Sequence, residues 1–174
     1  MNRPGPSFAT ALAALLVAAP VPLRAATPAK ESSAGAIVLR PLSLLKKTDM
    51  NFGTLATSPS AGTATLNPVT GVVSTTGGVT ALPIGTSATA AVFVGAGSKN
   101  APYQIRLPTN PITITRVGGT ETMTVSNWTL DGPTNRRVPA NQAFQFKVGA
   151  RVNVGANQAG GTYAGTFNIT VHYP

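Results

Sequence analysis

Two segments near the C-terminal end alternate apolar and polar residues almost without error, and this alternation most constrains the fold. In Ala143–Val154, phenylalanine, valine and alanine stand at every second position, mostly between polar residues. Thr162–Tyr173 repeats the pattern, with its large apolar side chains on one face and Thr, Asn and His on the other. A period of two with one apolar face is typical of a half-buried antiparallel strand. Because the Gly- and Asn-rich segment Gly155–Gly161 joins them, the two strands are predicted to form a β-hairpin.

The preceding part of the chain predicts further short strands. It is rich in Thr, Val, Gly, Asn and Pro, and no helical period is sustained after residue 27. The expected strands are Ile37–Lys46, Met50–Leu55, Gly62–Leu66, Gly71–Ser74, Ala88–Val94, Tyr103–Leu107, Ile112–Arg116 and Thr122–Leu130. A hairpin turn is expected at Asn67-Pro68, a polar connection from Gly77-Gly78, and a bulge between Val125 and Trp128.

This pattern predicts one all-β domain over residues 37–174, an antiparallel β-sandwich of the immunoglobulin-like or pilin-like type. Its core is expected to contain Phe144, Phe146, Val148, Val152, Phe167, Ile169 and Val171.

Residues 1–25 are expected to be a cleaved secretory signal peptide. Arg3 precedes the apolar run Ser7–Ala19, and prolines and small residues follow. The run is too short to span a bilayer, and no later apolar run approaches eighteen residues. Residues 26–36 are expected to be a flexible lead-in. The mature chain is therefore predicted to be exported to the periplasm, cell surface or medium, without a transmembrane segment.

The charge of the chain limits its partners. The formal net charge is +9, and about +7 remains without Arg3 and Arg24. The basic residues are scattered and no aromatic residues interleave with them, so nucleic acid is not expected as a partner. A surface with few acids favours contact with anionic envelope polysaccharide. There is no cysteine, which excludes disulfides and thiolate chemistry.

No catalytic or metal site is predicted. His172 is the only histidine, and the acids Glu31, Asp49, Glu121 and Asp131 are too widely separated for a calcium loop. No nucleophile-elbow motif provides a serine for a triad. We therefore expect no enzymatic activity and no cofactor.

Four segments carry a resemblance to a known family: Asp49–Leu55 (DMNFGTL), Gly118–Val125 (GGTETMTV), Phe146–Ala150 (FKVGA) and Gly161–Tyr173 (GTYAGTFNITVHY). The chain resembles the domain of unknown function 4402 family of exported proteins from Gram-negative bacteria, roughly over Ile37 to Tyr173. More distantly, the FG segment and the C-terminal strand are similar to spore-coat-U-type subunits of chaperone–usher pili, which are incomplete immunoglobulin-like sandwiches. The resemblance implies a structural or adhesive surface role, with like subunits and a periplasmic chaperone as partners.

These observations favour a subunit of a pilus-like or cell-surface assembly that acts by β-strand pairing along an exposed edge. The expected edge residues are Phe167, Ile169, Val171 and Tyr173. One feature argues against strand donation: Thr27–Ala36 lacks the alternating apolar residues that a donated strand requires, and Ile37–Leu45 is expected to belong to the domain.

The alternative is a stand-alone secreted or envelope-associated β-sandwich that binds a ligand, with polysaccharide as the ligand class. Its binding loops would be Gly95–Pro102 and Asp131–Pro139.

Overall fold

The computed structural model describes residues 36–174, so the expected signal peptide and almost all of the expected lead-in lie outside the described residues. This part is built of strands without a helix, and every strand pairing in it is antiparallel. The strands are β1 Ser43–Thr48, β2 Thr54–Leu66, β3 Val73–Leu82, β4 Ala91–Ala96, β5 Pro102–Arg106, β6 Ile112–Arg116, β7 Thr122–Leu130, β8 Asn135–Arg137, β9 Ala143–Val154, β10 Tyr163–Ala164 and β11 Thr170–His172. The predicted all-β antiparallel class is confirmed. Between residues 36 and 174, no helix is long and apolar enough to cross a membrane.

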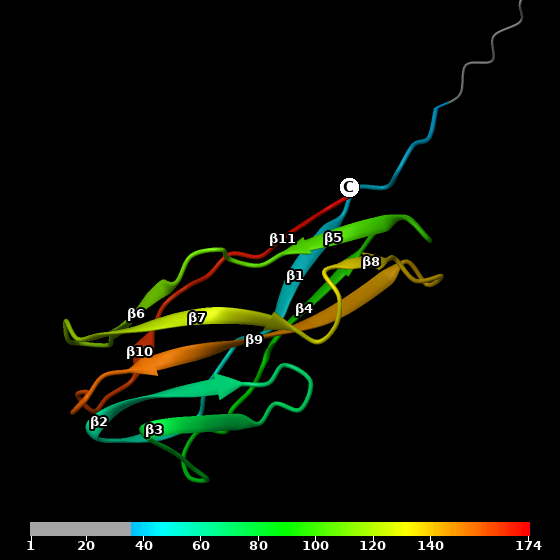
Figure 1. Cartoon of the computed structure of the whole chain (residues 1–174). Helices are drawn as coiled ribbons and strands as arrows, with labels where there is room; N and C mark the ends of the chain where they lie inside the picture. The colour runs from blue at the N-terminus through cyan, green and yellow to red at the C-terminus, as the bar shows by residue number, and fades with distance from the viewer. Residues whose placement is uncertain (1–35) are drawn as a thin grey trace, which may run out of the picture. The chain divides into compact units, whose positions relative to one another are not determined.

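The long strand β9 organises the larger sheet because it pairs along both of its edges. Strand β7 lies along one edge, while β4 and β2 follow one another along the other. Beyond these neighbours, β1 pairs with β4, β3 with β2, and β6 with β7, and β10 adds to β6. In Figure 1, β9 runs through the middle of the fold, with the β2–β3 hairpin at one end and β5, β8 and β11 at the other.

The first half of β9 lies under a second, three-stranded sheet of order β11-β5-β8. Tyr103 and Ile105 of β5 are buried between the layers. Phe93 of β4 stacks on Phe146 of β9, with ring centroids 5.4 Å apart. This half of the molecule is therefore a two-layer sandwich with an aromatic core.

The second half of β9 has a different cover. Its buried cluster consists of Ala64, Val79, Val125, Ala150, Val152 and Val154. The three-stranded sheet contributes no residue to this cluster, and Met50, Phe52 and Leu55 pack against it from the segment that leads into β2. The second layer is thus a complete sheet over one half of β9 and a single connecting segment over the other.

The predicted hairpin between Ala143–Val154 and Thr162–Tyr173 is wrong. The C-terminal segment does not pair with β9: β10 pairs with β6 of the larger sheet, and β11 pairs with β5 of the smaller one. The reason is that both edges of β9 are already occupied by β7 and by β4 and β2. Gly165–Ile169, between the two short strands, belongs to no strand.

The predicted core is therefore confirmed only for the residues of β9. Phe144, Phe146, Val148 and Val152 are buried. Phe167, Ile169 and Val171 of the C-terminal segment are only partly buried.

Three further expectations concern the start of the first strand, the hairpin at Asn67-Pro68 and the bulge in β7. The first strand begins at Ser43 instead of Ile37. The hairpin that turns at Asn67-Pro68 is present as β2–β3, but it runs through Gly77-Gly78, which lie in β3. The expected bulge in β7 is confirmed, because the register with β9 shifts at Asn127, whose φ is 49°.

We predict that Phe146→Ala lowers the free energy of unfolding by about 3–5 kcal/mol, because it removes a fully buried ring and leaves a cavity. The matched control is Gln145→Ala on the exposed face of the same strand, expected to change stability by no more than about 0.5 kcal/mol. Urea unfolding of both variants checks the inward face of β9. Equal losses in the two variants would show that the facing assigned to β9 is incorrect.

Candidate functional site

A groove of about 630 Å³ lies where the second sheet is missing. Its floor is the apolar face of β6, β7 and β9, formed by Ile112, Ile114, Met123, Val125, Val152 and Val154. These side chains form continuous rows across the sheet, because Ile112 stands opposite Val125 and Val125 stands opposite Val152. Of the floor residues, those in the middle of the sheet are buried, whereas Ile112, Ile114 and Met123 stay partly exposed.

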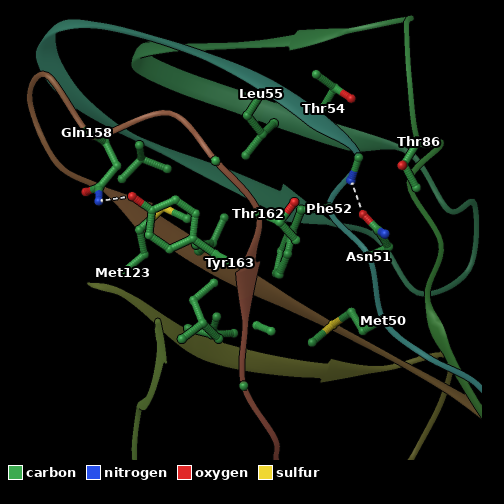
Figure 2. Close-up of a pocket in the computed structure, with 18 of the residues that line it drawn as sticks. Met50, Asn51, Phe52, Thr54, Leu55, Thr86, Met123, Gln158, Thr162 and Tyr163 are labelled. Atoms are coloured by element: carbon green, nitrogen blue, oxygen red, sulfur yellow. Dashed lines mark hydrogen bonds between the residues drawn. The ribbon is translucent and has the colours of Figure 1, made fainter. Parts of the chain in front are cut away.

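One wall of the groove is the segment that connects β1 to β2. Asn51 pairs with Thr89 through two backbone hydrogen bonds of 2.8 Å, and its Oδ1 accepts the N–H of Gly53 at 2.7 Å. Gly53 has φ 78°, and a Cβ there would approach backbone atoms of Thr86 and Ala88 to 3.2 Å. The Asn-Phe-Gly sequence therefore makes a tight turn that directs Phe52 toward the groove (Figure 2).

The opposite wall is the segment that leads from β9 into β10. The Tyr163 hydroxyl donates to the carbonyl of Ala159 at 2.7 Å and accepts from Gln158 Nε2 at 2.8 Å (Figure 2). The amide of Asn157 donates to the carbonyl of Ser58 in β2 at 2.9 Å. The Asn157–Ser58 bond therefore attaches the connecting loop to β2, while the two Tyr163 bonds hold the loop together.

Two glycines of the GTYAGTF sequence allow this wall to lie close to β6. A Cβ on Gly165 would come within 2.7 Å of Ile114 Cγ2 and 2.9 Å of the carbonyl of Thr113. A Cβ on Gly161 would meet Arg116 Cδ at 2.9 Å. The sequence motif is therefore a packing requirement of this wall.

Arg116 also forms the main ion pair near the groove. Its Nε and a terminal nitrogen donate to the Glu121 carboxylate at 2.6 and 2.9 Å across the β6–β7 turn. The Arg116 hydrogen bonds lower the pKa of Glu121 from its ordinary 4.5 to about 2. The Arg116–Glu121 ion pair holds the aliphatic part of the Arg116 side chain in place, and Gly161 packs against it.

Beside the groove, a seam separates β1 from the C-terminal segment, and the two do not pair across it. The groove lining reaches Phe167 of this segment but includes no residue of β1. Within residues 36–174, β1 pairs only with β4, while β10 and β11 are the edge strands of their sheets. In that same range, the backbone of Gly165–Ile169 makes no hydrogen bond to another strand. At the far end of the seam, the Tyr173 hydroxyl donates to the carbonyl of Arg40 and accepts from the amide of Ser98, both at 2.8 Å.

The residues predicted as an assembly edge lie along this seam. Phe167 lines the groove and packs on Trp128 with ring centroids 4.7 Å apart. Ile169 and Val171 are partly buried against the aromatic core around Phe146, and the Tyr173 hydroxyl bridges the far end of the seam through its bonds to Arg40 and Ser98. The floor residues and Phe52 were not predicted as site residues. Alternation along a strand indicates which face is apolar, but it does not indicate whether a second sheet covers that face.

The residues examined for catalytic chemistry lie apart from one another. His172 is partly exposed in β11, and Glu31 is outside the described residues. Asp49, Glu121 and Asp131 each form an ion pair, with Lys46, Arg116 and Arg136 respectively. Within residues 36–174, no three His, Asp or Glu side chains are grouped as metal ligands.

The two loops of the alternative interpretation do come together. The amide of Asn100 donates to the carbonyl of Val138 at 2.9 Å, and the amide of Val138 donates to the carbonyl of Ala101 at 3.0 Å. A terminal nitrogen of Arg137 adds a 2.9 Å bond to the carbonyl of Asn100. The loops Gly95–Pro102 and Asp131–Pro139 therefore form one polar region beside β5 and β8.

The structure defines an all-β protein of antiparallel strands, in which connecting segments alone cover part of the apolar sheet face. The chain belongs to the family described as Domain of unknown function (DUF4402), which it matches over residues 42–173. No curated protein and no solved structure matches the chain.

We predict that Gly165→Ala destabilises the fold by about 1–3 kcal/mol, because its Cβ overlaps Ile114 and Thr113. The matched control is Gly160→Ala in the same connection, where a Cβ meets open space; we expect a change of about 0.5 kcal/mol or a small gain. Thermal unfolding of both variants measures the difference. A Gly165 variant as stable as the Gly160 variant would contradict the close contact with β6.

The Arg116–Glu121 pair predicts a pH dependence of stability. A carboxyl group whose pKa is lower in the folded than in the unfolded state stabilises the fold above the unfolded value, and this contribution is lost as pH falls through the folded value. Because the folded pKa of Glu121 is about 2, the wild type should exceed Glu121→Gln in stability above about pH 4.5. The gap should close between about pH 4.5 and 2. Urea midpoints across this range test it, and a gap that stays constant down to pH 2 would rule the pair out as its source.

Proposed function

We propose that the protein is a non-enzymatic structural subunit, exported to the cell surface, that assembles by accepting a β-strand in the groove and seam between β1 and the C-terminal segment. The observation that carries this proposal is an apolar floor covered only by connecting segments, together with the unpaired outer edges of β1 and of the C-terminal strands. An added strand would place alternate apolar side chains on Ile112, Ile114 and Met123. Its backbone would pair with the free edge of the C-terminal segment.

The groove lies between the two segments that carry the resemblance to pilus subunits. Asp49–Leu55 forms one wall, and the first part of Gly161–Tyr173, as far as Phe167, belongs to the other. In the spore-coat-U-type subunits that these segments resemble, the immunoglobulin-like sandwich is incomplete and a chaperone covers the gap before assembly. This likeness supports a periplasmic chaperone as a second partner of the groove.

The chain also carries a candidate for the donated strand. Ile37 and Val38 are each 91% exposed and Leu39 is 42% exposed, in a segment without secondary structure. Three consecutive large apolar residues in water are costly, and a groove on another copy would remove them from solvent. Within the expected strand Ile37–Leu45, regular strand structure begins at Ser43, while Arg40 is hydrogen-bonded to Tyr173 and Leu42 packs against the core.

The proposed acceptor of Ile37–Leu39 is a second copy. Within one molecule, Arg40 is attached to Tyr173, which lies eight residues along the chain from Gly165 on the groove floor. Because Ile37–Leu39 lies next to Arg40, at the Tyr173 end of the C-terminal segment, binding to a second molecule leaves this contact in place.

Cross-linking between single-cysteine variants tests this proposal, because the chain has no cysteine of its own. Ile37 and Leu39 would share the face turned toward the floor, so a tagged Ile37→Cys chain is mixed with an untagged Ile114→Cys chain and oxidised. We expect a mixed disulfide dimer, since Ile114 is part of the groove floor.

The control is Thr113→Cys, on the exposed outer face of the same strand. Mixed dimers with Ile114→Cys but not with Thr113→Cys would support strand donation into the groove. Equal yields from both positions, or a protein that stays monomeric without forming mixed dimers, would reject it.

A further inference from the structure

The outer face of the three-stranded sheet β11-β5-β8 gathers polar and basic side chains. In β5, Tyr103 and Ile105 point into the core, so Pro102, Gln104 and Arg106 point outward. Register places the partners of these residues on the same face. Thr170 lies opposite Arg106, His172 and Asn135 lie opposite Gln104 on either side, and Arg137 lies opposite Pro102.

Hydrogen bonds order the middle of this outer face. Gln104 Nε2 donates to Asn135 Oδ1 at 2.9 Å, and Arg106 Nε donates to Gln104 Oε1 at 3.4 Å. Arg137 uses one terminal nitrogen on the carbonyl of Asn100. Each guanidinium has five N–H donors, so both retain donors for a ligand.

The positive charge of this face is uncompensated. Within residues 36–174 the acids are Asp49, Glu121 and Asp131, and each is paired with a basic residue outside the face. The same residues include ten Lys and Arg side chains. Arg106 and Arg137 are therefore left without a carboxylate partner in the described part of the chain, and Lys99 adds an exposed cation next to Asn100.

We propose that this outer face binds an acidic polysaccharide. The positions of Arg106 and Arg137 are about 14 Å apart, from four residue rises along β5 between Arg106 and Pro102 and one step across to β8. Amide, hydroxyl and imidazole groups fill the interval. A polymer of sugar acids matches this order, because carboxylates reach the two guanidinium groups while hydroxyls bond to Gln104, Asn135 and Thr170.

Other polyanions fit the face less well. Its named residues include no Phe, Tyr or Trp on which a nucleic-acid base could stack, and no exposed large apolar residue that could enter a lipid layer. None of its residues lines the groove, so this proposal does not depend on strand donation.

Binding of polygalacturonate to the full chain tests the proposal, with uncharged dextran, a single-stranded oligonucleotide and anionic phospholipid vesicles as comparison probes. We expect polygalacturonate binding that weakens with salt, and a loss of about tenfold or more in the double variant Arg106→Gln/Arg137→Gln. The control Lys47→Gln/Arg151→Gln makes the same charge change in β1 and β9, and its loss should stay under about twofold.

Several results would overturn the proposal: no binding of polygalacturonate, equal losses in the two double variants, or tighter binding of the oligonucleotide or vesicles. Failure of the groove cross-link would leave this result unaffected. Unchanged unfolding of both double variants confirms that binding losses do not arise from misfolding.

Discussion

The pairing of β9 along both edges is the constraint on which the rest of the structure depends. With β7 on one edge and β4 and β2 on the other, β9 has no edge left for another strand. Its alternate side chains from Phe144 to Val154 then define the single buried face of the larger sheet. The remaining strands can only extend this sheet beyond the neighbours of β9 or pack over its buried face.

The C-terminal segment does both, and the seam follows from this. Excluded from β9, it joins β6 through β10 and then crosses to β5 through β11. The crossing from one layer to the other leaves Gly165–Ile169 without a ladder. Because the three-stranded sheet ends over the first half of β9, the floor under the second half is covered by connecting segments alone.

The sequence predicts the local elements well and their partners poorly. Alternation in Ala143–Val154 and Ile112–Arg116 is a property of each strand, so the strands and their inward faces could be recognised. Each strand has only two edges, and several strands of the chain can pair with the same edge. A short connection such as Gly155–Gly161 favours a hairpin, but it does not prevent another strand from occupying that edge of β9. The groove arises from this competition for edges, which is why its floor could not be recognised from the sequence, whereas the motif glycines that line it carried the family resemblance.

The hydrogen bonds around the seam bear on how an added strand would bind. The Tyr173 hydroxyl fixes one end, the Gln158–Tyr163 bonds fix the other, and the Asn51–Gly53 turn holds Phe52 in place. An acceptor held in this way loses little conformational entropy on binding, so the cost of ordering falls mainly on the incoming strand. That strand gains its own backbone pairing and the removal of large apolar side chains from water. In the proposed strand donation, burial of an exposed apolar segment such as Ile37–Leu39 in the groove of another molecule would supply this gain.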